Sequence, residues 1–71
     1  MRITGNVVYQ EIEGGFWGIV TDDHVQYEPV DGLPVSLQRQ HTRVEAEVEP
    51  VQAISFRMWG QPVRVLSIHR L

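Results

Sequence analysis

Hydrophobic and polar positions alternate without interruption between residues 42 and 49. Val44, Ala46 and Val48 fall on one parity of this segment, and the charged residues fall on the other. Because neighbouring side chains of a strand point to opposite faces, this pattern predicts a strand with one face in the core and one in water. The other apolar segments alternate less cleanly, but turn-forming residues separate them at short intervals, as in small all-β sandwiches and barrels.

This pattern predicts several strands and one short helix within a single domain, residues 1–71. The helix runs from Pro34 to Gln40, because proline suits a first helical turn and Leu33 and Leu37 would share one face. A helix of about two turns is unstable alone, so we expect its leucines to close one end of a barrel. The predicted strands occupy residues 2–12, 16–21, 24–29, 42–49 and 53–59, and residues 63–70 continue the last one beyond a kink.

The order of these elements distinguishes between two small barrels. Three strands, a helix, a fourth strand and a long bent fifth strand are the order of the OB fold. An SH3-like barrel, the main alternative, carries its short helical turn just before the last strand. We therefore predict an all-β fold, a small five-stranded OB-like barrel, in which the final segment pairs with the first strand to close the sheet.

The stretch GGFWGIV, residues 14–20, determines which aromatic side chains face the core. Its two glycines favour a two-residue turn, which would place Ile12 opposite Trp17. The two aspartates that follow the stretch favour another such turn, which would place Val20 opposite Val25. The more apolar face that results is assigned to the core. It carries Val7, Tyr9, Phe16, Gly18, Val20, Val25, Tyr27 and Pro29.

With this assignment, Trp17 and Ile19 point outward, and Tyr27 covers Gly18 across the ladder. Several large apolar groups would then lie exposed on one face of the sheet, which is how interaction surfaces are usually marked. The outer face would also carry Val8, Gln10, Ile12, His24, Gln26 and Glu28.

A turn centred on Val51 would pair the fourth strand with the fifth. On the outer face it would place Glu45 opposite Arg57 and Arg43 opposite Trp59, which are an ion pair and an arginine over an indole. The inward side chains of the fifth strand would be Ile54, Phe56 and Met58.

Composition limits the classes to which the protein can belong. An apolar content of 42% is normal for a globular protein and too high for a disordered one. The absence of cysteine excludes disulfides and cysteine-based metal sites. No apolar run reaches the roughly 18 residues of a membrane span, and no signal-peptide core follows the first residues, so we expect a cytoplasmic protein.

The charge of the chain gives little support to nucleic-acid binding. The net charge is −3, and all six basic residues are arginine. Arginine suits phosphates and aromatic rings, but a GC-rich genome produces the same bias. The sequence contains no basic stripe of the kind that is typical of nucleic-acid-binding domains.

No residue pattern indicates catalysis, a metal or a cofactor. His24, His41 and His69 lack the spacing of metal ligands, and the aspartates beside His24 are typical of a hairpin turn. No serine lies in a nucleophile motif. Carboxylate pairs such as Glu45 and Glu47 have the spacing of a solvated strand face. We therefore expect a protein that is not an enzyme and that carries no catalytic residue, metal site or cofactor.

Two strings, VVYQEIEGGFWGIV near the start and RMWGQPVRVLSI near the end, resemble an uncharacterised family of small prokaryotic OB-like domains. Members of that family carry the pattern GxVVYxxLEGGFWGI, followed by MWGxPVEIL. The resemblance spans most of the chain and implies an OB-like fold, but it implies no particular activity. The chain departs from the pattern at His24, where glycine is common, and at Arg57, where histidine is common. Other matching positions are Tyr27, Pro29, Leu33 and Pro34.

These observations favour a binding or interaction module, and two functions fit the predicted outer face. The first is contact with protein, either a homodimer or a larger partner, because it requires only an apolar surface with a polar rim. The alternative is binding of single-stranded nucleic acid, with tryptophans stacking on bases. A third interpretation is structural, in which another part of the chain covers Trp17. The candidate binding residues are Trp17, Ile19, Ile12, Gln26, Glu28, Trp59 and Arg43.

Overall fold

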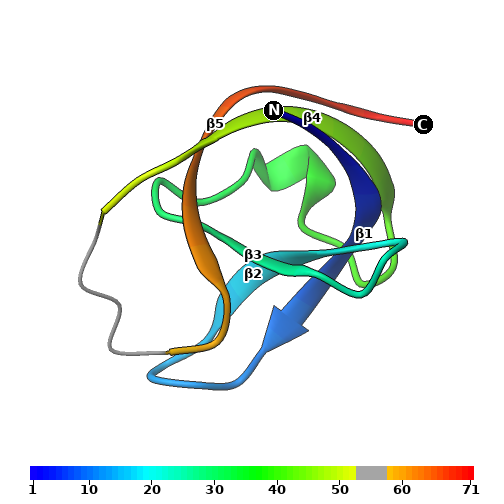
Figure 1. Cartoon of the computed structure of the whole chain (residues 1–71). Coiled ribbons are helices and arrows are strands. Elements are labelled where there is room, and N and C mark those ends of the chain that lie inside the picture. The colour runs from blue at the N-terminus through cyan, green and yellow to red at the C-terminus, as the bar shows by residue number, and fades with distance from the viewer. Residues whose placement is uncertain (53–57) are drawn as a thin grey trace.

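A computed structural model of the chain describes residues 1–52 and 58–71 and shows a small all-β barrel (Figure 1). The strands close in the order β1-β2-β3-β5-β4, with β4 paired back to β1. Neighbouring strands are antiparallel except for β3 and β5, which are parallel. This arrangement confirms the predicted five-stranded OB-like barrel. Its strands are β1 (Arg2–Gln10), β2 (Phe16–Thr21), β3 (Gln26–Pro29), β4 (Arg43–Pro50) and β5 (Gln61–Arg70).

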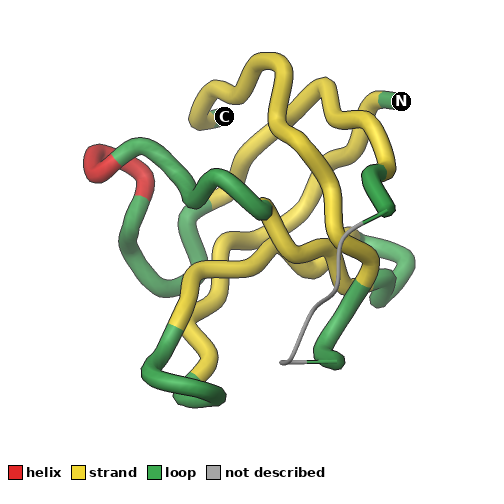
Figure 2. The backbone as a smooth tube through the Cα atoms, turned by 90° about the vertical axis from the view of Figure 1, so that its left-hand side faces the viewer, coloured by secondary structure: helices red, strands yellow, loops and turns green. Residues whose placement is uncertain are grey.

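The predicted helix from Pro34 to Gln40 is wrong, because this segment forms only a 3-10 turn. The turn, η1 (Val35–Leu37), lies within the long connection between β3 and β4 (Figure 2). It has no side-chain cap and too few residues to propagate a helix, so packing must hold it in place. Leu33 and Leu37 are each 7% exposed and join the core, as the sequence predicted for these two leucines.

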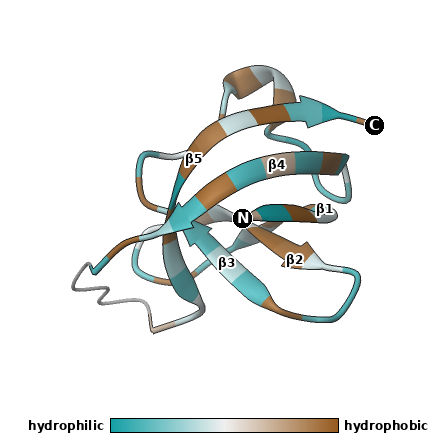
Figure 3. Ribbon diagram, turned by 45° about the horizontal axis from the view of Figure 1, so that its top comes forward, coloured by the Kyte–Doolittle hydropathy of each residue, from teal (hydrophilic) through white to brown (hydrophobic). Residues whose placement is uncertain are grey.

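The strand that the sequence predicted most firmly forms as expected. β4 alternates along its whole length between buried and more exposed side chains. Figure 3 shows the alternation of hydrophobic and hydrophilic residues along the same strand. Val44, Ala46 and Val48 are 0%, 2% and 0% exposed. They face the barrel interior, and the glutamates between them face outward.

The last strand differs from the prediction in extent and in partners. β5 pairs with β4 and, at its start, with β3, whereas the predicted pairing with the first strand is wrong. Met58, predicted to face the core, is 89% exposed and has a φ of 48°, a left-handed conformation that interrupts a strand. The remaining part of the predicted segment lies outside the described residues. That part includes Ile54, Phe56 and the pairing of Glu45 with Arg57.

The first hairpin has a longer loop than the sequence predicted. Residues 11–15 form the loop, so Trp17 lies opposite Tyr9 rather than Ile12. Glu13 adopts a φ of 51° beside two glycines that also have positive φ, and this conformation lengthens the turn. The register therefore shifts by three residues, an odd number, which exchanges the two faces of β2 relative to β1.

The second hairpin is longer than predicted by one residue. Val20 lies opposite Gln26 rather than Val25. The loop comprises residues 22–24, and His24, with a φ of 65°, supplies the left-handed position that a three-residue hairpin loop requires. This shift is also odd, so it cancels the first one for β3, whose interior face carries Tyr27 as predicted.

The two register shifts reverse the predicted interior of β2. Ile19 is fully buried and belongs to the core, and Trp17 packs against that core from the same face. The prediction that these two side chains point outward is therefore wrong. The core is formed by Ile3, Val7, Ile19, Leu33, Leu37, Val44, Ala46, Val48 and Val63.

Candidate functional site

The outer face of β2 carries a compact aromatic cluster. Phe16 and Gly18 point outward, and the indole of Trp59 lies over both of them. The rings of Phe16 and Trp59 meet edge to face, with centroids 5.3 Å apart and planes inclined at 75°. A Cβ atom on Gly18 would lie 2.5 Å from Cζ3 of Trp59, so only glycine leaves room for the indole. We call Phe16, Gly18, Gln26 and Trp59 the Trp59 cluster.

Gln26 holds Trp59 in this position with both ends of its amide. In the orientation that satisfies the amide, Nε2 donates to the carbonyl oxygen of Trp59 at 2.8 Å. The Oε1 atom accepts a hydrogen bond from Nε1 of the indole at 3.0 Å. The indole N–H and the main chain of Trp59 are both fixed to β3, which orients the ring as well as burying it.

Other predicted binding residues lie around this cluster or away from it. Glu28 follows Gln26 on the outer face of β3, but its side chain is only 4% exposed. Ile12 lies in the loop between β1 and β2 and is half-buried. Trp17 meets Tyr9 edge to face on the interior side, with ring centroids 5.0 Å apart. The predicted outward surface of Trp17 and Ile19 therefore does not exist.

The predicted contact between Arg43 and Trp59 is wrong. Arg43 lies on the outer face of β4, and its Nη1 and Nη2 donate to the two carboxylate oxygens of Asp22 at 2.6 and 3.2 Å. This hydrogen bonding lowers the pKa of Asp22 below its ordinary value of 3.8. Trp59 instead covers Gly18, the position that the sequence assigned to Tyr27. Tyr27 lies opposite Ile19 and packs against the core.

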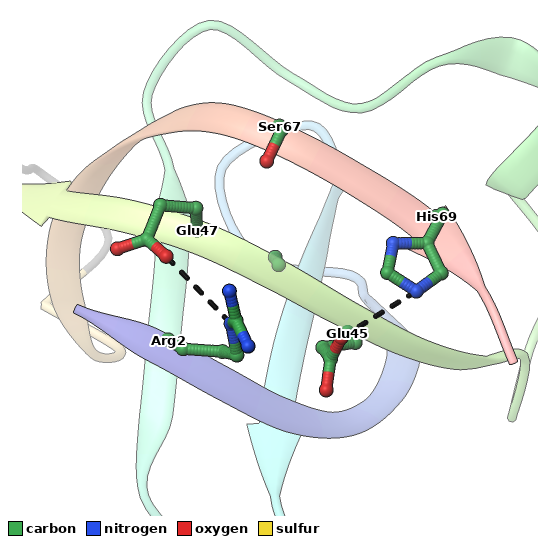
Figure 4. Close-up of a pocket in the computed structure, with 6 residues that line it drawn as sticks. Arg2, Glu45, Glu47, Ser67 and His69 are labelled. Carbon is green, nitrogen blue, oxygen red and sulfur yellow. Dashed lines mark ion pairs between the residues drawn. The ribbon is translucent and has the colours of Figure 1, made fainter.

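The outward side chains of β4 and their partners on β1 and β5 form a second surface, which we call the charged surface. Its hollow, of about 140 Å³, is lined by Arg2, Glu45, Glu47, Ser67, His69 and Ala46 (Figure 4). Nε of Arg2 lies 3.8 Å from Glu47, and Nε2 of His69 lies 3.5 Å from Glu45. The N-terminal amine donates to Glu47 at 2.8 Å and lowers its pKa.

These residues form no recognisable reactive centre. Among the described residues, no group of three or more histidine and carboxylate side chains has the arrangement of a metal site. The described part of the chain also contains no helix that is long and apolar enough to span a membrane. The chemistry that the described residues do offer is an aromatic cluster on one side of the barrel and paired charges on another.

The sequence did not predict that Phe16 lies on the outer side of β2, beneath Trp59, or that Met58 is exposed. It placed both in the core, because it paired the strands by the shortest possible turns. One signal was available: a strand glycine needs an aromatic cover, and the sequence offers Trp59 as well as Tyr27 for that role. That signal was assigned to Tyr27, which faces the interior as predicted, whereas the register shift turns Gly18 to the outer face.

No family model, no curated protein and no solved structure matches this chain. The resemblance to the uncharacterised family of OB-like domains therefore remains a prediction from the sequence.

Proposed function

We propose that this protein is a non-enzymatic interaction module that contacts another protein through the outer face of β2 and β3, at the Trp59 cluster. Met58 is the observation that carries the proposal. It lies next to Trp59 in the chain and is 89% exposed, although burying a methionine side chain is energetically favourable. Methionine adapts its shape to irregular partners and is over-represented at protein-binding surfaces.

The position of the cluster supports the same proposal. OB folds bind their ligands on the outer face of strands two and three, between the loop that follows the first strand and the loop between the fourth and fifth strands. Phe16 directly follows the first of these loops, and Met58 and Trp59 belong to the second connection. A half-buried indole with a fixed orientation, beside an exposed flexible side chain, is the composition of a protein-contact centre.

The charges of the described residues argue against the alternative, single-stranded nucleic acid. Arg2, Arg43 and Arg64 each lie against a carboxylate, with nitrogen to oxygen distances of 3.8, 2.6 and 3.1 Å. A phosphate backbone would have to compete with these carboxylates for the guanidinium groups. Trp17, the ring first expected to stack on a base, packs against the core instead. We also propose that the protein is cytoplasmic and related to the uncharacterised family of OB-like domains.

Site-specific photo-crosslinking tests the protein contact. A photoreactive residue replaces Met58 in one variant and Val35 in another, since Val35 is 82% exposed but lies in η1. In extract of the cells that produce the protein, we expect a discrete, nuclease-resistant protein adduct at position 58 and none at position 35. Equal labelling at the two positions, or an adduct that nuclease removes, contradicts the proposal.

A fluorescence titration tests the nucleic-acid alternative. The Trp17→Phe variant leaves Trp59 as the only tryptophan. Mixed single-stranded DNA or RNA is added at low salt, and we expect no change in the emission of Trp59. Quenching that disappears as salt is added would support base stacking at the Trp59 cluster and would overturn protein contact as its function.

A further inference from the structure

Within residues 1–52 and 58–71, the second half of β5 has β4 along one side and no strand along the other. β3 pairs with β5 only from Gln61 to Val63, and the last main-chain bond on that side runs from the N–H of Val30 to the carbonyl of Val63. Beyond Val63, none of the described residues forms a backbone hydrogen bond to this edge. Figure 3 shows the same arrangement, with only a loop and η1 beyond the free side of β5.

The ladder with β4 identifies the backbone groups that point to the free edge. The N–H of Leu71 donates to the carbonyl of Arg43 at 3.0 Å, which makes this a hydrogen-bonded position of the antiparallel pair. Hydrogen-bonded and non-hydrogen-bonded positions alternate, so Ser67 and His69 also bond to β4. The N–H and C=O groups of Ile68 and Arg70 must therefore point away from β4, toward the open side.

The side chains along this edge do little to prevent another strand from pairing with it. Neither proline nor lysine, two residues that commonly protect edges, occurs between Val63 and Leu71, and the arginines of this stretch are Arg64 and Arg70. Leu66 is 55% exposed and Leu71 is 60% exposed. The register shift between Glu47 and Val48 also leaves Leu66 without a partner residue on β4.

We propose that this edge pairs with the same edge of a second copy of the chain, antiparallel and around a two-fold axis at Ile68. This register places Ile68 opposite its counterpart and Leu66 opposite Arg70, so the two free positions, Ile68 and Arg70, both acquire hydrogen-bonding partners. A β-branched pair lies at the centre, where cross-strand apolar contacts stabilise a sheet. A two-fold contact of this kind is self-complementary and closes as a dimer.

The charges also fit a second copy. In this register Ser67 lies opposite His69 of the second copy, and no two charges of the same sign face each other. Ser67 is flanked on β4 by Glu47, and each His69 lies 3.5 Å from its own Glu45. Across the new sheet, Glu47 and Ser67 of one copy are therefore followed by His69 and Glu45 of the other. The imidazole of His69 lies in this row between the carboxylates of the two copies.

Amide exchange of the unmodified protein tests the pairing most directly. We expect the N–H groups of Ile68 and Arg70 to become protected as protein concentration rises, while those of Ser67 and His69 are protected at every concentration by β4. Sedimentation over the same range should show the mass rising from 8.2 kDa toward twice that value. A constant mass, or protection at Ile68 and Arg70 that does not depend on concentration, would falsify the dimer.

Two pairs of variants locate the contact. Arg70→Pro removes only an N–H that faces the open edge, whereas Arg70→Ala keeps it, so the dissociation constant should rise about tenfold or more in the first alone. Leu66→Lys places a charge on the edge, and Val35→Lys places the same charge elsewhere. If Arg70→Pro does not fold, the lysine pair still decides the question, because equal dimerisation of the two lysine variants overturns the proposal.

The dimer is independent of the proposed protein contact at the Trp59 cluster. The Met58→Gln variant should dimerise like the unmodified chain, although it lacks the exposed methionine. If Met58→Gln abolishes the dimer and Leu66→Lys does not, the copies associate through the Trp59 cluster and the β5 edge is not their interface.

Discussion

The outer surfaces of β2 and β4 differ in what covers them. The outer surface of β2 is covered by the chain itself, because Trp59 lies on Gly18 and Phe16 and is held there by Gln26. The outer surface of β4 is open to water, and its glutamates lie against Arg2, Arg64 and His69 of the neighbouring strands. Burial stabilises the first surface, and solvent-screened charges stabilise the second.

This difference teaches where a protein of 71 residues obtains its stability. A domain of this size buries only about 60% of its unfolded surface, so an aromatic cluster outside the barrel adds to a small core. Exposed ion pairs each contribute about 1 kcal/mol or less. We therefore expect changes at the Trp59 cluster to have much larger effects than changes on the charged surface.

Removing the indole is the most severe test of this comparison. Trp59→Ala should lower the free energy of unfolding by about 3 kcal/mol, because it uncovers Gly18 and Phe16 and leaves the Oε1 atom of Gln26 without its indole donor. Urea unfolding followed by circular dichroism measures the change. Trp59→Phe keeps a ring in place and should lose less. Equal losses for the two variants would show that burial by the ring is not the main contribution.

Adding a methyl group beneath the indole should have the next largest effect. Gly18→Ala places a Cβ 2.5 Å from the ring of Trp59 and should reduce stability by about 2 kcal/mol. In the Trp59→Ala background the same methyl group has space, so the two changes should be strongly non-additive. A double-mutant cycle measures this coupling, and additive effects would place Trp59 away from Gly18 in solution.

A single ion pair of the charged surface should contribute far less. Nη1 of Arg64 lies 3.1 Å from Glu49, and both side chains are about half exposed. Arg64→Ala should therefore lower the unfolding free energy by about 0.5 kcal/mol, and most of that difference should vanish at high salt. A loss as large as that of Gly18→Ala would contradict the contrast between the two surfaces.

The smallest expected effect is a shift in one titration. Hydrogen bonds from Arg43 lower the pKa of Asp22 from 3.8 in the folded protein. The stabilisation that this produces is present above the unfolded-state pKa and is lost as the pH falls through the lower folded-state pKa. NMR titration of the Asp22 carboxyl group measures the shift. Arg43→Gln should return the pKa toward 3.8, and an unchanged pKa would exclude Arg43 as its cause.

The sequence was sufficient for one part of the fold and misleading for another. Strict alternation predicted β4 correctly, since reversing its faces would bury three glutamates. The hairpins on either side of β2 were wrong, because both faces of β2 are apolar and periodicity could not choose between them. The face that β2 buries was therefore set by the lengths of the two hairpin loops. These lengths depend on the positive φ angles of Glu13 and His24, and neither residue type signals that conformation reliably.

For the candidate site, too, the sequence predicted the local features but not the contact between distant segments. The sequence correctly identified that Gly18 needs an aromatic cover and that Trp59 belongs to the outer surface. It could not pair the two, because they are far apart along the chain and meet only after the barrel has closed.

The sequence by itself determined the all-β class, the order of the strands along the chain, the buried face of β4 and the two leucines that pack into the barrel. These features follow from local alternation and from turn residues, which act within a few positions of the chain. Only the tertiary structure decided the register of the two hairpins, the burial of Trp17 and Ile19, and the position of Trp59 on Gly18. Each of these depends on the contact of segments distant in sequence, and a shift of an odd number of residues is enough to turn a strand over.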